Sequence, residues 1–225
     1  MKQTARAVEI VVDPTSKVSG LLNVPAKPRA AYLLAHGAGA GMQHPFMTAV
    51  AEGLSSRQIA TLRYQFLYME RGSKRPDSPS VCHAAVRAAT HTATLQLPDV
   101  PLFAGGKSFG GRMTSQAQAL SALPAVRGLI FLGFPLHPPK KPSVVRAEHL
   151  EAVRVPMLFL QGTRDELADM TLLESVIARL GSLATLQNIE AADHSFHVPA
   201  RSGRKDADVL DTMLDSLSAW AFAHL

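Results

Sequence analysis

The sequence predicts an α/β fold of three layers, in which a mostly parallel sheet lies between two layers of helices. The first observation behind this prediction is that strand-like and helix-like apolar periods alternate from residue 31 to the C-terminus, as they do in parallel sheets with crossover helices. The second is that residues 106–110, Gly-Lys-Ser-Phe-Gly, match Gly-x-Ser-x-Gly between a buried strand and a helix. No linker or change of composition divides the 225 residues, so we expect a single domain, 1–225.

The N-terminal elements are expected to form an antiparallel hairpin, followed by the first parallel strands. Residues 7–12 and 18–24 have strand-like patterns and are joined by the turn formers Asp13-Pro14-Thr15-Ser16. The elements expected next are a strand at 31–36, a helix at about 44–57, a strand at 59–65 and a helix at about 79–94.

The second half of the chain continues the alternation. The expected elements are a strand at 101–105, a helix at 111–120, a strand at 126–132, a short helix near 144–152, a strand at 155–161, a helix at 169–180, a strand at 184–190 and a helix at 206–223. Only 22 residues, 133–154, separate two of these strands, which is too few for a helical cap domain. We therefore expect an open site without a large cap.

Three chemically useful side chains follow strands of the predicted sheet. Ser108, Asp165 and His194 each come just after a strand, and ligands of such sheets bind at the carboxyl ends of the strands. A serine hydroxyl becomes a good nucleophile when a histidine takes its proton and a carboxylate orients that histidine. The order Ser, Asp, His is the one expected of the α/β-hydrolase fold. The sequence thus predicts a catalytic triad.

Neighbouring residues offer alternatives to two members of this triad. Glu166 and Asp169 lie close to Asp165, and His197 lies three residues beyond His194. Asp165 is preferred because it directly follows the strand-ending Gly162-Thr163, and His194 because it comes first in its loop. The two histidines have no third ligand at a recognisable spacing, so we expect no metal and no cofactor.

A glycine-rich loop follows the strand at 31–36. Neither this loop nor the segment 106–110 matches a complete phosphate-binding motif. A Walker A loop that ends at Gly106-Lys107-Ser108 would need glycine in place of Pro101, and a dinucleotide fingerprint that starts at Gly37 would need glycine or alanine in place of Met42. The loop would let the backbone N–H of Ala38 approach a substrate oxygen beside the N–H of Phe109. These two amides are the predicted oxyanion hole.

Five segments together resemble one protein family. They are His36-Gly37-Ala38-Gly39-Ala40-Gly41, Tyr68-Met69-Glu70-Arg71, Gly105-Gly106-Lys107-Ser108-Phe109-Gly110-Gly111-Arg112, Pro135-Leu136-His137-Pro138-Pro139 and Asp193-His194-Ser195-Phe196. From about residue 30 to the C-terminus the chain resembles the α/β-hydrolase family of the testis-expressed and NSL-complex-subunit hydrolase-like proteins, which are near relatives of dienelactone hydrolases.

The resemblance implies roles for the same residues. Ser108 would be the nucleophile, Asp165 the acid and His194 the base, with the oxyanion hole near Ala38 and Phe109. The chain has serine where dienelactone hydrolases proper have cysteine, which argues against a dienelactone substrate. The family also includes subunits of larger assemblies, so a non-catalytic interaction module is the alternative to a serine hydrolase.

Apolar and basic residues surround the predicted site. Met42, Phe46 and Tyr68 offer apolar contact to a small acyl or aryl group, while Lys107 and Arg112 would attract a carboxylate-bearing ester. These five are the candidate substrate-binding residues. The expected reaction is hydrolysis of a small-molecule ester or thioester through an acyl-enzyme on the serine, and peptidase activity is a third possibility.

The composition excludes several other classes of protein. The net charge is +5, but the basic residues are scattered, which argues against a nucleic-acid partner. No apolar run approaches the roughly 20 residues of a membrane span, and residues 1–9 contain no apolar signal segment. A single cysteine, Cys82, fits a reducing compartment. We therefore expect a cytoplasmic protein without a membrane partner, and the sequence leaves its oligomeric state open.

Overall fold

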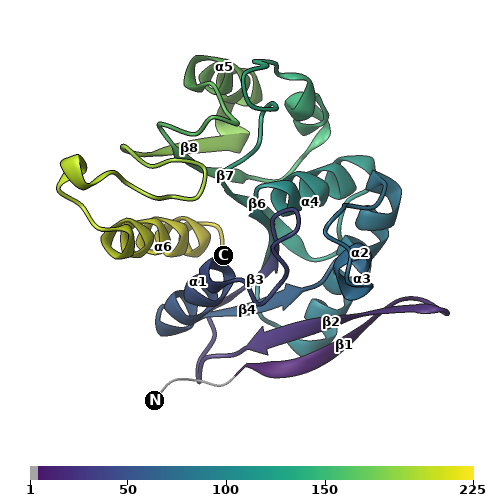
Figure 1. The fold of residues 1–225 in the computed structure, drawn as a ribbon. Coiled ribbons are helices and arrows are strands. Elements are labelled where there is room, and N and C mark those ends of the chain that lie inside the picture. The colour runs from purple at the N-terminus through teal and green to yellow at the C-terminus, as the bar shows by residue number, and fades with distance from the viewer. Residues whose placement is uncertain (1–4) are drawn as a thin grey trace.

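A central sheet of eight strands organises the computed structural model, which describes residues 5–225 (Figure 1). In chain order the strands are β1 (Arg6–Asp13), β2 (Ser16–Asn23), β3 (Ala30–Ala35), β4 (Ile59–Tyr64), β5 (Leu102–Lys107), β6 (Val126–Leu132), β7 (Met157–Gly162) and β8 (Ala184–Ile189). Their order in the sheet is β1-β2-β4-β3-β5-β6-β7-β8. The β1–β2 and β2–β4 pairs are antiparallel and the other pairs are parallel, as predicted.

Helices cover both faces of this sheet. They are α1 (Pro45–Ser56), α2 (Leu67–Glu70), α3 (Pro79–Gln96), α4 (Phe109–Leu120), α5 (Met170–Leu180) and α6 (Asp206–Ala223), with short 3₁₀ helices η1 (Val145–Ala152), η2 (Gly181–Leu183) and η3 (Ala200–Ser202). In Figure 1, α1 and α6 lie on one side of the sheet, and α3 and α4 lie on the other. Among residues 5–225, no helix combines the length and the apolar character needed to cross a membrane.

Two apolar clusters fill the spaces between these layers. Successive side chains of a strand point to opposite faces, so the neighbours Leu33 and Leu34 of β3 enter different clusters, and both are at most 1% exposed. One cluster packs under α3, α4, η1 and α5, and the other under α1 and α6. Because both faces are covered, the central strands read as continuous apolar runs.

The predicted architecture is confirmed: helices cover both faces of a mostly parallel sheet that begins with an N-terminal antiparallel hairpin. In the described chain only loop and η1 stand between β6 and β7, so no large cap is present, as expected. Several details differ from the prediction: the helix expected near 144–152 is the 3₁₀ helix η1, and the strand expected at 155–161 is Met157–Gly162. The four residues of α2 were expected as loop, and helix α4 begins at Phe109 rather than at Gly111. Glycine is a poor helix former, so the sequence pattern does not show that Gly110 and Gly111 belong to the first turn; in the structure an added Cβ at Gly110 would lie 2.6 Å from the carbonyl oxygen of Ala35.

Candidate active site

A strained turn between β5 and α4 carries Ser108. Its φ of 51° and ψ of −118° lie in a region that a residue with a Cβ rarely adopts. The turn is so tight that a Cβ at Gly106 would lie 2.2 Å from the carbonyl oxygen of Ala35, and a Cβ at Gly110 would lie 2.5 Å from the carbonyl oxygen of His36. Only glycine fits at these two positions, and the serine side chain consequently stands at the carboxyl end of the sheet.

The serine hydroxyl is the first member of a hydrogen-bonded row. Its Oγ lies 2.8 Å from Nε2 of His194, and Nδ1 of the same ring lies 2.7 Å from Oδ2 of Asp165. Since the carboxylate accepts from Nδ1–H, Nε2 is left free to accept the hydroxyl proton. The structure therefore brings together the three side chains that the sequence singled out, from loops after β5, β7 and β8.

The carboxylate of Asp165 is fully buried and well partnered. Besides the His194 ring, its Oδ2 accepts from Nε2 of Gln161 at 2.6 Å, and its Oδ1 accepts from the N–H of Leu167 at 2.8 Å. The amide oxygen of Gln161 in turn accepts from the N–H of Phe134 at 2.8 Å. Sequence reasoning missed Gln161. The signal was a polar residue inside the apolar strand Met157–Gly162.

The alternative acid and base residues lie elsewhere. Glu166 is exposed, and Asp169 is the N-cap of α5, where it accepts from the N–H of Leu172. His197 is 65% exposed and pairs with Asp206 at the start of α6. In the structure the ring that meets the serine is thus the first histidine of the loop.

His36 fixes the loop that carries the predicted oxyanion amide. Its Nδ1 donates to the carbonyl of Gly37 at 2.7 Å, and its Nε2 accepts from the N–H of Phe66 at 3.2 Å. Burial lowers the pKa of this imidazole to about 4, so it is neutral near pH 7. The Gly37 carbonyl and the Ala38 N–H belong to one trans peptide and point in opposite directions, so the bond that holds the carbonyl also orients the amide of the exposed Ala38.

The second predicted oxyanion amide belongs to Phe109. This residue is the first of helix α4, so its N–H has no carbonyl one turn earlier in the helix to bond. The positive end of the helix dipole lies at the same place. An anion next to Ser108 would therefore meet a favourable field.

A pocket of about 290 Å³ opens over the serine. Its lining residues are Gly37, Ala38, Ala40, His44, Phe46, Met47, Lys107, Ser108, His194 and Ser195. Phe46 stacks on Phe196 with ring centroids 5.9 Å apart, which makes one wall aromatic. The volume suits a small acyl or aryl group.

The remaining predicted substrate-binding residues do not line this pocket. Met42 is 6% exposed, and Tyr68 is 1% exposed beneath the site, where its hydroxyl accepts from the N–H of Gly39 at 3.4 Å. Arg112 lies one turn into α4 with its guanidinium 5.7 Å from the Phe109 ring. Its Nε is buried and has no hydrogen-bond partner among residues 5–225.

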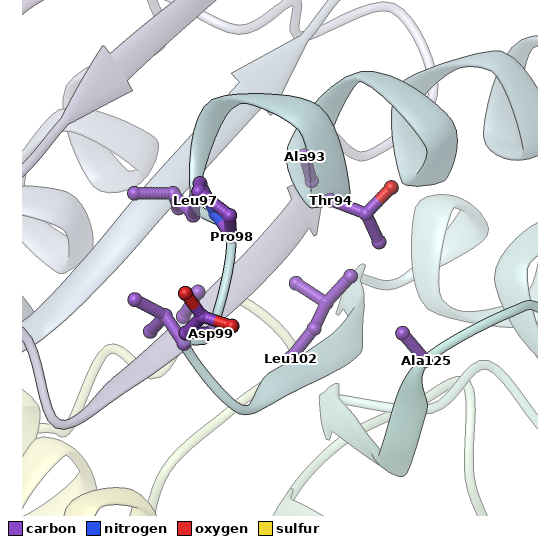
Figure 2. Close-up of a pocket in the computed structure, with 9 residues that line it drawn as sticks. Ala93, Thr94, Leu97, Pro98, Asp99, Leu102 and Ala125 are labelled. Atoms are coloured by element: carbon purple, nitrogen blue, oxygen red, sulfur yellow. The ribbon is translucent and has the colours of Figure 1, made fainter.

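A smaller pocket lies at the opposite end of the sheet. Figure 2 shows its lining in the turn after α3, with Leu97, Pro98 and Asp99 facing Leu102 and Ala125. It measures about 90 Å³ and sits where β5 begins, whereas the serine follows the end of β5. Its lining has one carboxylate and no histidine, whereas the pocket over the serine contains both Ser108 and His194. Within the described chain, no three His, Cys, Asp or Glu side chains gather as metal ligands would.

Comparison with known proteins places this geometry in context. A model of the alpha/beta hydrolase domain family matches residues 28–222. The dienelactone hydrolase of Anabaena variabilis is 23% identical with a TM-score of 0.78 over 100% of both chains. A lidless α/β serine hydrolase of Xanthomonas campestris is 21% identical with a TM-score of 0.75, over 96% of this chain and 95% of its own. The esterase domain of a Rhodothermus marinus protein is 16% identical with a TM-score of 0.73, over 97% of this chain and 98% of its own.

Proposed function

The chain belongs to the alpha/beta hydrolase family, and we propose that it hydrolyses small carboxylic esters or thioesters through an acyl-enzyme on Ser108. One observation carries the proposal: the serine on its strained turn hydrogen-bonds to His194, which hydrogen-bonds to the buried Asp165. A complete row of nucleophile, base and orienting acid is what acyl transfer requires.

In the first half of the reaction, Oγ of Ser108 attacks the carbonyl carbon of the substrate while its proton passes to Nε2 of His194. The charge that forms on the carbonyl oxygen is stabilised by the N–H groups of Ala38 and Phe109. Asp165 stabilises the imidazolium through Nδ1. The leaving alcohol or thiol then takes the proton from Nε2, and the acyl group stays on the serine.

In the second half, water replaces the leaving group. His194 takes a proton from the water, whose oxygen attacks the acyl carbonyl, and then returns the proton to Oγ of Ser108. The products are the free acid and the regenerated serine. No cofactor takes part in either half.

Pocket size and lining support a small substrate. The apolar side chains of Ala40, Phe46 and Met47 would contact a short acyl or aryl group within about 290 Å³. A site without a cap also admits substrates with bulky leaving groups, because the leaving group can extend into solvent.

A serine-reactive fluorophosphonate probe tests the proposal. We expect the purified parent protein to be labelled at Ser108, as mapped by mass spectrometry, and the Ser108→Ala and His194→Ala variants to remain unlabelled, because the nucleophile and its base act as a unit. Ser195→Ala is the matched control, since Ser195 lines the same pocket but its hydroxyl has no hydrogen-bonded base among residues 5–225.

Labelling that persists in Ser108→Ala would refute the proposal, as would a folded parent that takes up no probe. The second result would favour the non-catalytic interaction module, the reading that the resemblance to NSL-complex-subunit proteins supports. In that case the next experiment would be the capture of a protein partner.

A further inference from the structure

Lys107 connects three parts of the site. It is the last residue of β5, directly before Ser108, and it lines the pocket over the serine. The stem passes the glycine-rich loop, because a Cβ at Gly37 would lie 3.6 Å from Cγ of the lysine. At its far end, Nζ donates to the backbone carbonyl of His194 at 2.5 Å.

The ammonium also lies near an aromatic ring of the same loop. Nζ lies 5.2 Å from the ring centroid of Phe196, and the Phe196 ring also stacks on the ring of Phe46. Phe196 has a φ of 63°, so the backbone two residues after His194 is itself strained. Lys107 thus interacts with the loop that carries His194 at two points, the backbone carbonyl of His194 and the buried ring of Phe196.

Apart from the bond between the His194 ring and Ser108, the other hydrogen bonds of this loop within residues 5–225 do not join it to strand β5. Asp193 accepts from the N–H groups of Ser195 and His197, which closes the turn on itself, and His197 and Val198 bond to Asp206 of α6. Among the described residues, no other side chain hydrogen-bonds to the backbone of His194. The lysine is therefore the link between the base's backbone and the strand that carries the nucleophile.

Burial of this ammonium is unfavourable by itself. Burial lowers the pKa of Lys107 to about 8, and the nearby carboxylates of Asp165 and Asp193 offset that effect only in part. A neutral apolar side chain of the same length would fill the same space without this desolvation. What it would lack is the donor to the carbonyl of His194.

We propose that Lys107 is a positioning residue, which holds the His194 ring over Ser108 by hydrogen-bonding to the His194 carbonyl. The inference rests on the proposed function. A shift of about 1 Å in a catalytic group reduces turnover about 100-fold, so loss of this bond should slow the chemical step. The stem of Lys107 lines the pocket, so a substitution that keeps the stem should change substrate binding little.

The test compares Lys107→Met, which keeps the stem, with Lys107→Arg, which keeps a donor. With p-nitrophenyl butyrate as the probe substrate, we expect Lys107→Met to lower kcat by 10- to 100-fold and to leave KM within about twofold of the parent. Lys107→Arg should recover most of kcat. Thermal unfolding verifies that both variants are folded, and Lys107→Leu, which also has no donor, replaces Lys107→Met if that variant is not.

A second readout does not depend on turnover. The Nδ1 proton of His194, hydrogen-bonded to Asp165, should give a downfield proton resonance that is absent in His194→Ala. We expect this resonance in the parent and in Lys107→Arg, and we expect it to broaden or vanish in Lys107→Met because the ring is no longer fixed.

Three results would overturn the inference: an unchanged kcat and resonance in Lys107→Met, a change confined to KM, or equal losses in the Met and Arg variants, which would indicate packing rather than the donated hydrogen bond. A parent that neither labels nor hydrolyses would refute the proposed function alone. The resonance would then still decide whether the lysine positions the ring.

Discussion

At the scale of single residues, the neutral imidazole of His36 makes the stability of the fold depend on pH. Its ring must accept from the Phe66 N–H, which only the uncharged form can do while Nδ1 donates to Gly37. Burial lowers its pKa from 6.5 to about 4. Between these two pKa values His36 is protonated in the unfolded state but neutral in the folded state, so folding stability is lost as pH falls from 6.5 to 4.

We therefore predict that the free energy of unfolding falls by roughly 3 kcal/mol through this group over that window. Urea unfolding at a series of pH values measures the slope. His36→Gln should flatten it in part, and only in part because burial and the charge of Arg112 also lower the pKa of His149 to about 4.

The matched control is His91→Gln, which removes an exposed histidine of α3 and should leave the slope as in the parent. An identical slope in His36→Gln and the parent would contradict the prediction. It would mean that other groups, not the loop histidine, govern acid unfolding.

At the scale of elements, most of the fold was predictable because alternating apolar periods carry the information. The eight strands of the sheet were predicted because burial on both faces makes the central ones continuous apolar runs. Helix α2 was not, since four residues between Phe66 and Arg71 are too short for a helical period to show.

Some residues of the site could likewise be predicted from the sequence, and others could not. Ser108, Asp165 and His194 could be found because each follows a recognisable strand in the chain order typical of the fold. Gln161 and the lysine's bond to the histidine carbonyl could not, because both depend on contacts between segments far apart in sequence. Tyr68 was expected at the pocket, and its burial beneath the glycine-rich loop follows from the short helix that was not foreseen.

The turn from β5 into α4 makes a quantitative prediction about that element. Gly110→Ala would place a Cβ 2.5 Å from the carbonyl oxygen of His36, and backbone atoms cannot give way as the end of a side chain can. We expect the variant to lose more than about 3 kcal/mol of unfolding free energy and its probe labelling. Equilibrium urea unfolding measures the loss.

Gly72→Ala separates crowding from backbone strain. Gly72 has a φ of +76° but nothing within 4 Å of an added Cβ, so only the strain of the left-handed conformation should appear, about 1 kcal/mol. Equal losses of unfolding free energy in Gly110→Ala and Gly72→Ala would show that the close approach of α4 to β3 is not what requires glycine at position 110.

At the scale of the whole molecule, the sheet makes the two apolar clusters depend on each other. Adjacent residues of one strand, such as Leu33 and Leu34, belong to opposite clusters. A strand cannot leave one cluster and stay in the other. The expectation of a single domain therefore implies that both faces open together.

The chain contains one reporter for each face. Its only tryptophan, Trp220 of α6, is 9% exposed against Phe103 in one cluster, and its only cysteine, Cys82 of α3, is 1% exposed in the other. Burial raises the pKa of that thiol to about 11, so it is unreactive until its face opens.

We predict that Trp220 fluorescence and the reactivity of Cys82 toward a thiol reagent change with the same midpoint in urea. Cys82→Ala sets the background of the reagent, and its own fluorescence transition shows whether the cysteine affects stability. If Cys82 reacts at a urea concentration where Trp220 is still native, the helices over one face unfold first and the chain is not one cooperative unit. Coincident transitions would instead mean that α6, although it is last in the chain and far from Ser108 in sequence, is required for the same folded state that holds the serine, histidine and aspartate in line.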